Sequence, residues 1–543
     1  MLQPENHSRK YEALFADIDT GRTKVPMFQR DFVWGKEQTA KLIDSIIKGF
    51  PIGTFILWKT REELRSIRNI GNINLPEIPR GDSAFYVLDG QQRITSLYAV
   101  RKGIRLTKEG QVIDYSQISI NLNLDPDTDE RVVTVEPAEG AVSISVYKLL
   151  NGGVMEFARE YPEHLEKVDI YKRRLTGYDF STIEILDYPI DIACEVFTRI
   201  NTGGTELTLF EIMVAKTYDL ERKFDLAQEY QNLLDNKGQW KDLEDAHFDT
   251  ISSATILQCI STYMVKSTKR SDILKLNKQK FIDAWPIVKD GIFTAVDYFR
   301  SHFRIPVSHL LPYDALLVPF TYFFIHKKGK QPTPKQEKLL TQYFWWAALT
   351  SRFSSGADTK LAQDIEKMDL ILTEAAPDYK GNEVQISVDS LRWRWFSPGD
   401  GFCKAILCLY AYEQPCSFLN NDLVRIDNSW LKTANSVNYH HFFPRSYLDK
   451  EGVPNWKANC VLNITIVDDY LNKRSIGAKP PAVYMKTFKK DNRHLAETMC
   501  THLIDDLDTY GIWKNDYETF IEMRGQRVLE EIRKRLEPEL DSK

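Results

Sequence analysis

Apolar residues recur along this chain with two different periods, which separate the predicted helices from the predicted strands. Residues 36–50 place apolar side chains on one stripe at helical spacing, so we expect an amphipathic helix there. Residues 118–124 instead alternate apolar and polar side chains, which is typical of a half-buried strand. Apolar, β-prone runs at residues 54–58, 131–135 and 142–147 extend this β character. The N-terminal part of the chain is therefore predicted to combine sheet and helix.

From residue 225 to residue 390 the pattern is almost entirely helical. Trp345 and Trp346 lie in this region, and we assign them to the core because aromatic side chains on a helix usually pack inside. Residues 482–536 are also predicted to be helical. The many charges of residues 517–536 predict a solvated helix face there rather than a DNA-binding stripe.

A junction at residues 86–97 carries a dense group of polar side chains on one short turn. A β-prone run ends at Asp89-Gly90, which is a strong turn signal, and helical spacing resumes directly afterwards. Free N–H groups and the positive end of a helix dipole meet at such a helix start. The carboxylate, amides and guanidinium of residues 89–93 are therefore a candidate phosphate-handling site. A capped helix start in an ordinary α+β domain is the alternative interpretation.

A second group of polar residues precedes another predicted helix, and we place it in a turn between a strand and that helix. It consists of Arg199, Asn201, Gly203 and Gly204. The helix is expected to begin near Leu209 and to run toward Phe224, because Thr208 and Glu211 have the spacing of a capping box. Paired glycines let the backbone approach a ligand closely, and they are equally consistent with a plain tight loop.

Near the C-terminus the chain carries two adjacent histidines, His440 and His441, within the run Asn-Tyr-His-His-Phe-Phe-Pro. Neutral imidazole is a common metal ligand and titrates near working pH. Asn463 follows in a β-prone segment, and Asn472 lies shortly beyond it. A surface pair of histidines without a chemical role is the alternative for the dipeptide alone, and the two asparagines favour a site.

Composition narrows the class of protein. A chain of 543 residues predicts about three or four domains, and a net charge of −5 excludes a uniformly basic surface.

The most apolar stretch, residues 315–325, contains Pro319 and is shorter than the ~20 residues that span a membrane. The N-terminus lacks a signal-peptide pattern, so we expect a cytoplasmic protein. Seven cysteines without a Cys-x-x-Cys pair predict buried, reduced thiols rather than disulfides or structural zinc.

Three ordered motifs in the first 224 residues carry a resemblance to a known family. The pentapeptide Asp-Gly-Gln-Gln-Arg at residues 89–93, together with residues 25–34 and 196–205, resembles the GmrSD-type restriction protein N-terminal domain, which is similar to the ParB/sulfiredoxin-like fold. The resemblance implies that this domain binds an NTP (GTP, ATP or CTP) and has NTPase activity. The implied nucleotide-binding residues are Gln29, Arg30, Asp89, Gly90, Gln91, Gln92, Arg93, Arg199 and Asn201.

Residues 437–473 resemble an HNH nuclease, a ββα-metal fold in which two strands and a helix hold one divalent ion. The resemblance implies that His441 is the general base, that His440 and Asn472 hold the metal, and that Asn463 fixes the loop that orients His441. The family usually has a carboxylate where this chain has His440. An imidazole there favours Mn²⁺ or Ni²⁺ over Mg²⁺ more than a carboxylate would, so the metal preference stays open.

Taken together, these features predict an α+β chain in three parts. They are a ParB/sulfiredoxin-like nucleotide-binding domain (residues 1–224), an all-helical linking domain (225–390), and a helical domain with a ββα-metal HNH nuclease core (391–543).

The predicted function is an NTP-regulated, metal-dependent DNA endonuclease in anti-phage defence, similar to GmrSD-type modification-dependent enzymes and SspE-like phosphorothioation-sensing proteins. Its partners would be double-stranded phage or modified DNA and an NTP, with homo-oligomers possible and no membrane. The alternatives are a nucleotide-switched DNA-binding protein with a degenerate nuclease domain, and an NTPase acting on RNA or a protein partner.

Overall fold

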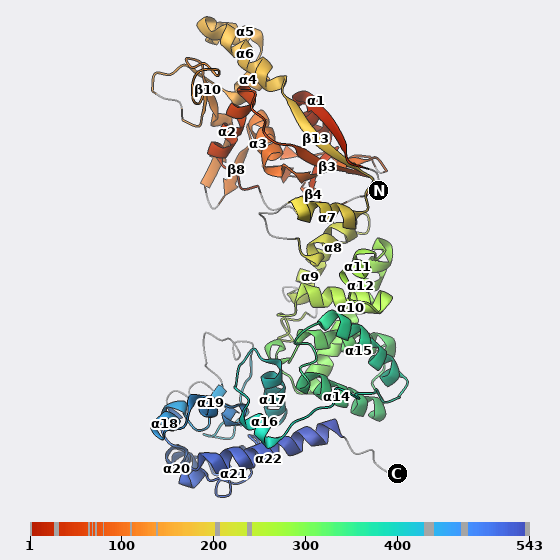
Figure 1. The fold of residues 1–543 in the computed structure, drawn as a ribbon, viewed down its shortest axis with the longest axis vertical. Coiled ribbons are helices and arrows are strands. Elements are labelled where there is room, and N and C mark those ends of the chain that lie inside the picture. The colour runs from red at the N-terminus through yellow and green to blue at the C-terminus, as the bar shows by residue number, and fades with distance from the viewer. Residues whose placement is uncertain are drawn as a thin grey trace. The chain divides into compact units, whose positions relative to one another are not determined.

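The computed structural model forms two compact units, Met1–Leu226 and Ala227–Lys543 (Figure 1). It describes residues 3–26, 32–62, 64, 66–67, 69–70, 73–79, 81–108, 111–136, 139–200, 207–235, 242–427, 439–467 and 476–537. The first unit mixes strands and helices, and the described part of the second is mainly helical. The predicted boundary near residue 390 stays a prediction.

A six-stranded mixed sheet organises the first unit. Its strand order is β1 (Glu5–Lys10), β13 (Asp179–Leu186), β3 (Phe55–Thr60), β7 (Ala84–Asp89), β2 (Thr23–Pro26) and β4 (Ser66–Ile67). The pairs β13–β3 and β2–β7 are parallel, whereas β1–β13, β3–β7 and β2–β4 are antiparallel. The predicted strand at residues 54–58 is therefore confirmed as β3, which lies inside the sheet.

Smaller β elements complete this unit. One three-stranded sheet has the order β11 (Val133–Thr134), β10 (Ser119–Asn121) and β12 (Ser143–Ser145), and this confirms the β character predicted in that region. Two hairpins are formed by β5 (Asn69–Ile70) with β6 (Ile73–Asn74) and by β8 (Arg105–Lys108) with β9 (Gln111–Asp114).

Helices α1 to α6 contribute buried side chains to one hydrophobic core shared with the sheet, and Figure 1 shows these helices around the strands of the first unit. Helix α2 confirms the predicted amphipathic helix, since Ala40, Ile43, Ile46 and Ile47 are all buried. The helices are α1 (Tyr11–Asp19), α2 (Lys36–Ile47), α3 (Gln91–Lys102), α4 (Val146–Asn151), α5 (Val154–Glu160), α6 (Leu165–Thr176), α7 (Ile190–Ile200) and α8 (Leu209–Thr217).

Helix α7 corrects one prediction, because the second polar motif follows a helix and not a strand. Ile190, Ala193, Cys194 and Phe197 are buried at the spacing of one helix face, so a helical period was present where the sequence analysis assumed a strand.

Helix α8 begins at Leu209 with the predicted capping box. Thr208 Oγ1 accepts a hydrogen bond from the Glu211 N–H at 3.2 Å, and Glu211 accepts one from the Thr208 N–H at 2.8 Å. The helix ends at Thr217 rather than near Phe224, since Asp219 and Phe224 pair across a tight turn.

The described part of the second unit is built from helices and one two-stranded sheet. Its helices are α9 (Leu226–Leu234), α10 (Ser253–Val265), α11 (Arg270–Leu274), α12 (Lys278–Ser301), α13 (Leu317–Lys327), α14 (Pro334–Leu349), α15 (Ala357–Leu372), α16 (Val388–Arg392), α17 (Gly401–Tyr412), α18 (Arg445–Lys450), α19 (Asn455–Ala458), α20 (Pro481–Asp491), α21 (Leu495–Cys500) and α22 (Tyr517–Leu536), and its strands are β14 (Tyr439–His441) and β15 (Ile464–Ile466). Trp345 and Trp346 are buried, as predicted.

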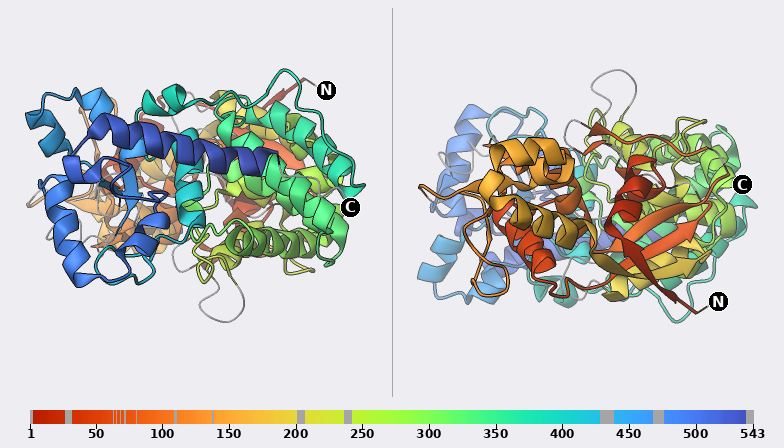
Figure 2. Two further views of the ribbon diagram at one scale, coloured as in Figure 1. Left: turned by 90° about the horizontal axis from the view of Figure 1, so that it is seen from below. Right: turned by 90° about the horizontal axis from the view of Figure 1, so that it is seen from above.

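Helix α22 runs as one long helix along this unit and packs against α14 and α16 (Figure 2). Its charges do not all form the predicted solvated face, because Arg524 is fully buried and Glu531 is 7% exposed. The Arg524 guanidinium donates to the backbone carbonyls of Leu462 and Ile464, at 2.6 and 2.7 Å, and it lies over the Tyr410 ring. Arg524 therefore ties β15 to α22.

The cysteines and the helix lengths bear on the predicted class of protein. All seven cysteines are free thiols, and five are buried, whereas Cys416 is partly exposed and Cys500 is exposed. Among the described residues, no helix has both the length and the apolar character that crossing a membrane requires.

Candidate functional site

The strand-turn-helix junction predicted at residues 86–97 is present in the first unit. Strand β7 ends at Asp89, and helix α3 starts at Gln91. Gly90 between them has a φ of 90°, and a Cβ there would lie 2.3 Å from the Phe55 ring. Only glycine fits this turn without strain, since both the backbone conformation and the close approach exclude a side chain.

The guanidinium of Arg93 forms hydrogen bonds with other groups of the protein. Nη1 donates to the carbonyl of Ile52 at 2.5 Å, while Nη2 donates to the carbonyl of Thr54 and to the Asp89 carboxylate, each at 3.1 Å. The same group lies 5.1 Å from the centroid of the Phe55 ring. These interactions hold the loop before β3 against the start of α3.

Gln92 is also bonded to backbone. Its Oε1 accepts hydrogen bonds from the N–H groups of Val33 and Trp34, at 2.9 and 3.3 Å. The side chain is buried, so it fixes the segment that leads into α2. Two of the residues predicted to grip phosphate therefore position neighbouring loops.

Gln91 differs from its neighbours because its Nε2 has no partner among the described residues. Its side chain is 5% exposed, and the Nε2 donor makes no hydrogen bond to any part of the chain that the structure describes. Leaving a buried amide donor unpaired costs about 1–3 kcal/mol, so Nε2 of Gln91 calls for a partner from outside the described residues.

The other predicted nucleotide-binding residues fall outside this junction or outside the described residues. Arg199 is in the last turn of α7, where its exposed guanidinium pairs with Glu195 on the same helix at 2.5 Å. Gln29, Arg30 and Asn201 lie outside the described residues.

In the second unit, the two histidines stand on β14, which pairs antiparallel with β15. His440 is opposite Thr465 and His441 is opposite Ile464. A short 3₁₀ helix, η5 (Val461–Asn463), leads into β15. Residues from two predicted segments, 437–444 and 462–467, are thus brought together by strand pairing.

Asn463 is fully buried beneath the turn that follows β14. Its Nδ2 donates to the carbonyls of Phe443 and Ala458, and its Oδ1 accepts from the Phe443 N–H, all at 2.9 Å. All of these partners are backbone atoms, so the side chain fixes the loop after His441 and does not face a ligand.

The His441 ring is held by Asn459, a residue that the sequence analysis did not single out. His441 Nε2 lies 2.7 Å from Asn459 Oδ1, and Asn459 Nδ2 donates to the Phe396 carbonyl at 3.0 Å. The Asn459 amide nitrogen donates to Phe396, so the amide oxygen is the atom that faces the His441 ring. An amide oxygen can only accept a hydrogen bond, and the hydrogen of the neutral ring therefore sits on Nε2. The lone pair is then on Nδ1.

The environment keeps this ring neutral. Burial lowers the pKa of His441 to about 4, and the positive charge of Arg445 acts in the same direction, whereas the hydrogen bond to Asn459 opposes the shift. At neutral pH the Nδ1 lone pair is therefore available to accept a proton.

His440 carries an unpaired nitrogen. Nδ1 lies 3.3 Å from Thr465 Oγ1, but the buried Nε2 has no hydrogen-bond partner within the described ranges. The side chain is 3% exposed, and burial lowers the pKa of His440 to about 3, with further contributions from His441 and His502. A neutral imidazole with a free nitrogen fits a metal ion, which binds through such a lone pair.

Both histidines line a cavity of about 490 Å³. The other lining residues are Trp395, Phe396, Ser397, Pro398, Pro444, Arg445, Ser446, Asn459 and Gly477. Asn472, the predicted second metal ligand, lies outside the described residues. Among the residues that are described, no three His, Cys, Asp or Glu side chains group as a metal site, so the ββα-metal core stays a prediction.

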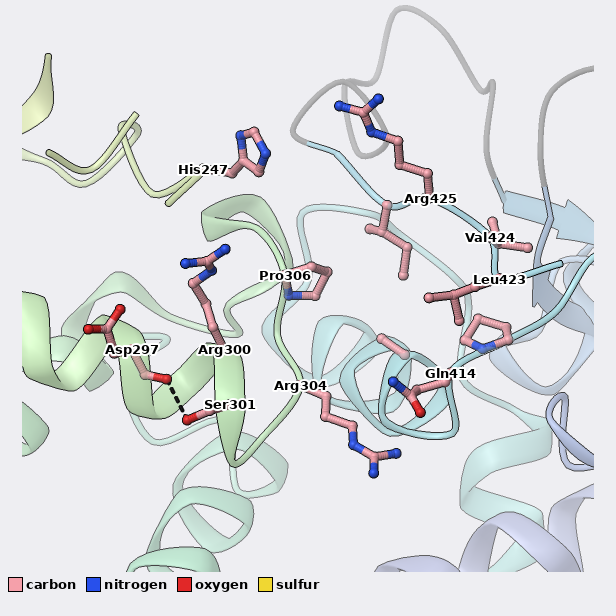
Figure 3. A pocket seen from close by; sticks show the side chains of 13 residues that line it. His247, Asp297, Arg300, Ser301, Arg304, Pro306, Gln414, Leu423, Val424 and Arg425 are labelled. Atoms are coloured by element: carbon pink, nitrogen blue, oxygen red, sulfur yellow. Dashed lines mark hydrogen bonds between the residues drawn. The ribbon is translucent and has the colours of Figure 1, made fainter. Parts of the chain in front are cut away.

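A second cavity in this unit, of about 610 Å³, has Arg300, Arg304 and Arg425 around it (Figure 3). Arg300 lies in the last turn of α12, and Arg304 donates to the carbonyl of Tyr412, the last residue of α17. Guanidinium groups at helix C-termini neutralise the free carbonyls there, which accounts for two of these cations.

Comparison with known proteins shows a similarity in the first unit. Residues 11–218 match the family model of the GmrSD restriction endonuclease N-terminal domain. An uncharacterized protein of Methanocaldococcus jannaschii is 23% identical over 578 aligned positions, which cover 94% of this chain and 96% of that protein. The resemblance stated for the first unit is thus supported, and the relative extends the similarity along almost the whole chain.

Proposed function

We propose that this protein is a restriction-type endonuclease that hydrolyses phosphodiester bonds of foreign DNA in phage defence. The cavity that His440 and His441 line carries the proposal, because it combines a neutral imidazole base with an imidazole nitrogen that no described residue bonds. Support from outside the site comes from the match of residues 11–218 to a restriction endonuclease domain. Dependence on a divalent cation and regulation by an NTP are parts of the same proposal.

In the proposed reaction His441 activates water. Its Nδ1 takes a proton as the water oxygen attacks phosphorus, and the bond from phosphorus to the leaving oxygen breaks. Asn459 holds the ring through Nε2, so the lone pair keeps one direction, and its oxygen stabilises the imidazolium that forms. Asn463 acts one step further away by fixing the turn after β14.

His440 and Asn472 would hold the divalent cation. His440 suits this role, because its buried Nε2 has no partner in the described structure. The cation would supply positive charge next to the phosphate and the leaving oxygen. An imidazole in place of a carboxylate favours Mn²⁺ or Ni²⁺, so we expect cleavage with these ions as well as with Mg²⁺.

An NTP would bind at the junction of the first unit. We propose that Asp89, Gly90 and Gln91 face the phosphates or their bound metal at the start of α3, together with Gln29, Arg30, Arg199 and Asn201. Gln92 and Arg93 would shape this site by fixing the loops around it, since both are bonded to backbone. Hydrolysis or exchange of the NTP would regulate cleavage in the second unit.

The proposal is tested by nicking of supercoiled plasmid and phage DNA with Mg²⁺, Mn²⁺ or Ni²⁺. His441→Ala should lower the rate by about 10²–10⁴-fold, because it removes the base. His494→Ala is the matched control, since this exposed histidine lies next to α21, outside the cavity, and should cut like wild type. Equal cleavage by His441→Ala and wild type would rule out the assignment of the base.

Modified and unmodified phage DNA, each incubated with and without GTP, ATP or CTP, tests the regulatory part. Cleavage that depends on one NTP is expected. Cleavage that ignores every NTP would remove the regulatory role, and cleavage of RNA in preference to DNA would change the substrate class.

A further inference from the structure

Three tryptophans in the second unit are unusually exposed. Trp393, Trp395 and Trp456 have 57%, 47% and 43% of their surface accessible, whereas Trp345 and Trp346 are buried in the same unit. Trp395 lines the cavity that contains His440 and His441. Large aromatic side chains left in water next to a cavity mark a binding surface rather than a core.

Two of these side chains already stack on each other. The rings of Trp393 and Trp456 are 4.7 Å apart between centroids and 19° from parallel. Each ring covers one face of the other, and both still keep about half of their surface in solvent. Such a pair offers flat π surface that is held in place before any partner arrives.

Backbone pairing joins this stacked pair to the candidate active site. Trp395 pairs with Cys460 in an isolated β-bridge, and the Phe396 N–H donates to the Asn459 carbonyl at 2.8 Å. Asn459 is the residue that holds His441, and Trp456 precedes it by about one helical turn in α19. The segments that carry the three tryptophans therefore contribute part of the cavity wall, through Trp395 to Pro398 and Asn459.

A positively charged side chain, Arg445, lies beside this aromatic surface. Arg445 is exposed and lines the same cavity, and its Nε and Nη2 both donate to Asn455 Oδ1, at 3.1 and 2.8 Å. No carboxylate pairs with it in the described part of the chain, whereas Arg394 nearby is bonded to both oxygens of Asp400. The Arg445 charge is thus free to meet an anion.

We propose that Trp393, Trp395 and Trp456 form a platform on which unpaired bases of a DNA strand stack, with Arg445 on the phosphate that enters the cavity. This inference rests on the proposed function and adds that the strand is locally single-stranded where it is cut. A duplex hides the faces of its bases, whereas a single strand offers both the base faces and the phosphates. Aromatic surface beside a guanidinium without a carboxylate partner matches that combination.

The test measures binding without cleavage. Full-length protein carrying His441→Ala is titrated in EDTA with a fluorescent single-stranded oligonucleotide, and a duplex of the same sequence is titrated in parallel. Adding Trp393→Ala, Trp395→Ala or Trp456→Ala should weaken single-strand binding by roughly 5- to 150-fold for each base that no longer stacks. Trp393→Phe should keep most of the affinity, because a smaller ring still stacks.

Ile287→Ala is the matched control, since Ile287 is 44% exposed on α12 and lies outside both cavities. This control should bind like the parent protein. The inference would be overturned if the tryptophan variants bound single strands as the parent does, or if duplex were preferred. It would also be overturned if those variants changed only the oligomeric state, which would identify a protein partner.

Failure of this inference can be told apart from failure of the proposed function. If the tryptophan variants in an otherwise active protein cut DNA normally and His441→Ala does not, the platform is wrong and the nuclease stands. If no cation supports cleavage by the wild type while the tryptophan variants lose single-strand binding, the nuclease is wrong and the platform stands.

Discussion

The two units each carry a dense group of polar side chains, and the two groups differ in where their hydrogen bonds go. At the α3 junction, Arg93 and Gln92 are bonded to backbone of neighbouring loops. On β14, among the described residues, His440 Nε2 has no hydrogen-bond partner and His441 is bonded through Nε2 alone. The first group mainly stabilises its own surroundings, whereas the second leaves nitrogen lone pairs that no described residue uses.

The density of polar residues in a sequence therefore does not by itself identify a site. A buried donor bonded to the protein contributes to stability, and its removal leaves acceptors unpaired. A buried polar atom without a partner costs stability and persists where function uses it. Mutations should therefore separate the two groups by their effect on folding and on binding or activity.

Arg93→Met gives the largest expected effect on stability. The change removes the donors from the carbonyls of Ile52 and Thr54 and leaves the Asp89 carboxylate without its cation. We expect a loss of about 2–4 kcal/mol in the free energy of unfolding, measured by urea denaturation of the full chain. Arg173→Met is the control, because Arg173 is 71% exposed and should cost almost nothing. A stable Arg93→Met protein that no longer bound NTP would instead make Arg93 a phosphate ligand.

Asn459→Ala tests the polar group around His441. The variant frees His441 Nε2, so the ring loses its direction, and we expect kcat to fall by about 10- to 100-fold. KM for DNA should stay nearly constant, since Asn459 contacts the ring and the Phe396 carbonyl. Asn459→Asp keeps an acceptor for Nε2 and should retain more activity than the alanine variant. A change in KM alone would show that Asn459 acts on DNA binding and not on the base.

Glu531 allows hydrogen-bonded and unbonded polar groups to be contrasted within one unit. Its carboxylate is hydrogen-bonded, and it lies in the same unit as the histidines. Burial alone would raise the pKa of Glu531, but hydrogen bonds from Arg527, Arg535 and Lys534 lower it to about 2 from its ordinary 4.5. The carboxylate therefore stabilises the fold above pH 4.5, and this contribution disappears as the pH falls toward 2.

Glu531→Gln should lower stability at pH 7 by about 2–3 kcal/mol, and the gap to wild type should shrink steadily below about pH 4.5. Urea denaturation at about pH 7 and about pH 3.5 measures this change. A gap that is the same at both pH values would show that packing, and not the charge of Glu531, is responsible.

Local signals in the sequence predicted most of the secondary structure. The stripe of α2, the capping box before α8 and the buried Trp345 and Trp346 all rest on residues close together in the chain. Helix α7 was missed because its apolar residues were assigned to a strand. The buried Arg524 was missed because its partners, the carbonyls of Leu462 and Ile464, come from a distant segment.

The candidate site could be predicted only in part for the same reason. The paired histidines and Asn463 were found through a resemblance that covers a continuous stretch of sequence. Asn459 was missed because its role arises only when the segment around Phe396 meets it in space, through the Trp395–Cys460 bridge and the hydrogen bond from the Phe396 N–H to the Asn459 carbonyl. An asparagine between a helix and a strand carries no local signal that would distinguish it from an ordinary turn residue.

Gln91→Leu has the smallest expected effect on stability, and it decides most clearly whether the junction of the first unit binds a ligand or is only structural. Leucine fills about the same volume without the unpaired Nε2 donor, so the free energy of unfolding should stay within about 1 kcal/mol of wild type, or rise. NTP affinity, measured by titration calorimetry, should fall, because the amide is the group at this junction that the described part of the protein leaves unbonded. Gln92→Leu is the matched control at the next position: it leaves the Val33 and Trp34 N–H groups without their acceptor and should destabilise the unit. If Gln91→Leu destabilised the unit while NTP binding stayed intact, the junction of the first unit would be purely structural, and only the histidine cavity would remain as a site of chemistry.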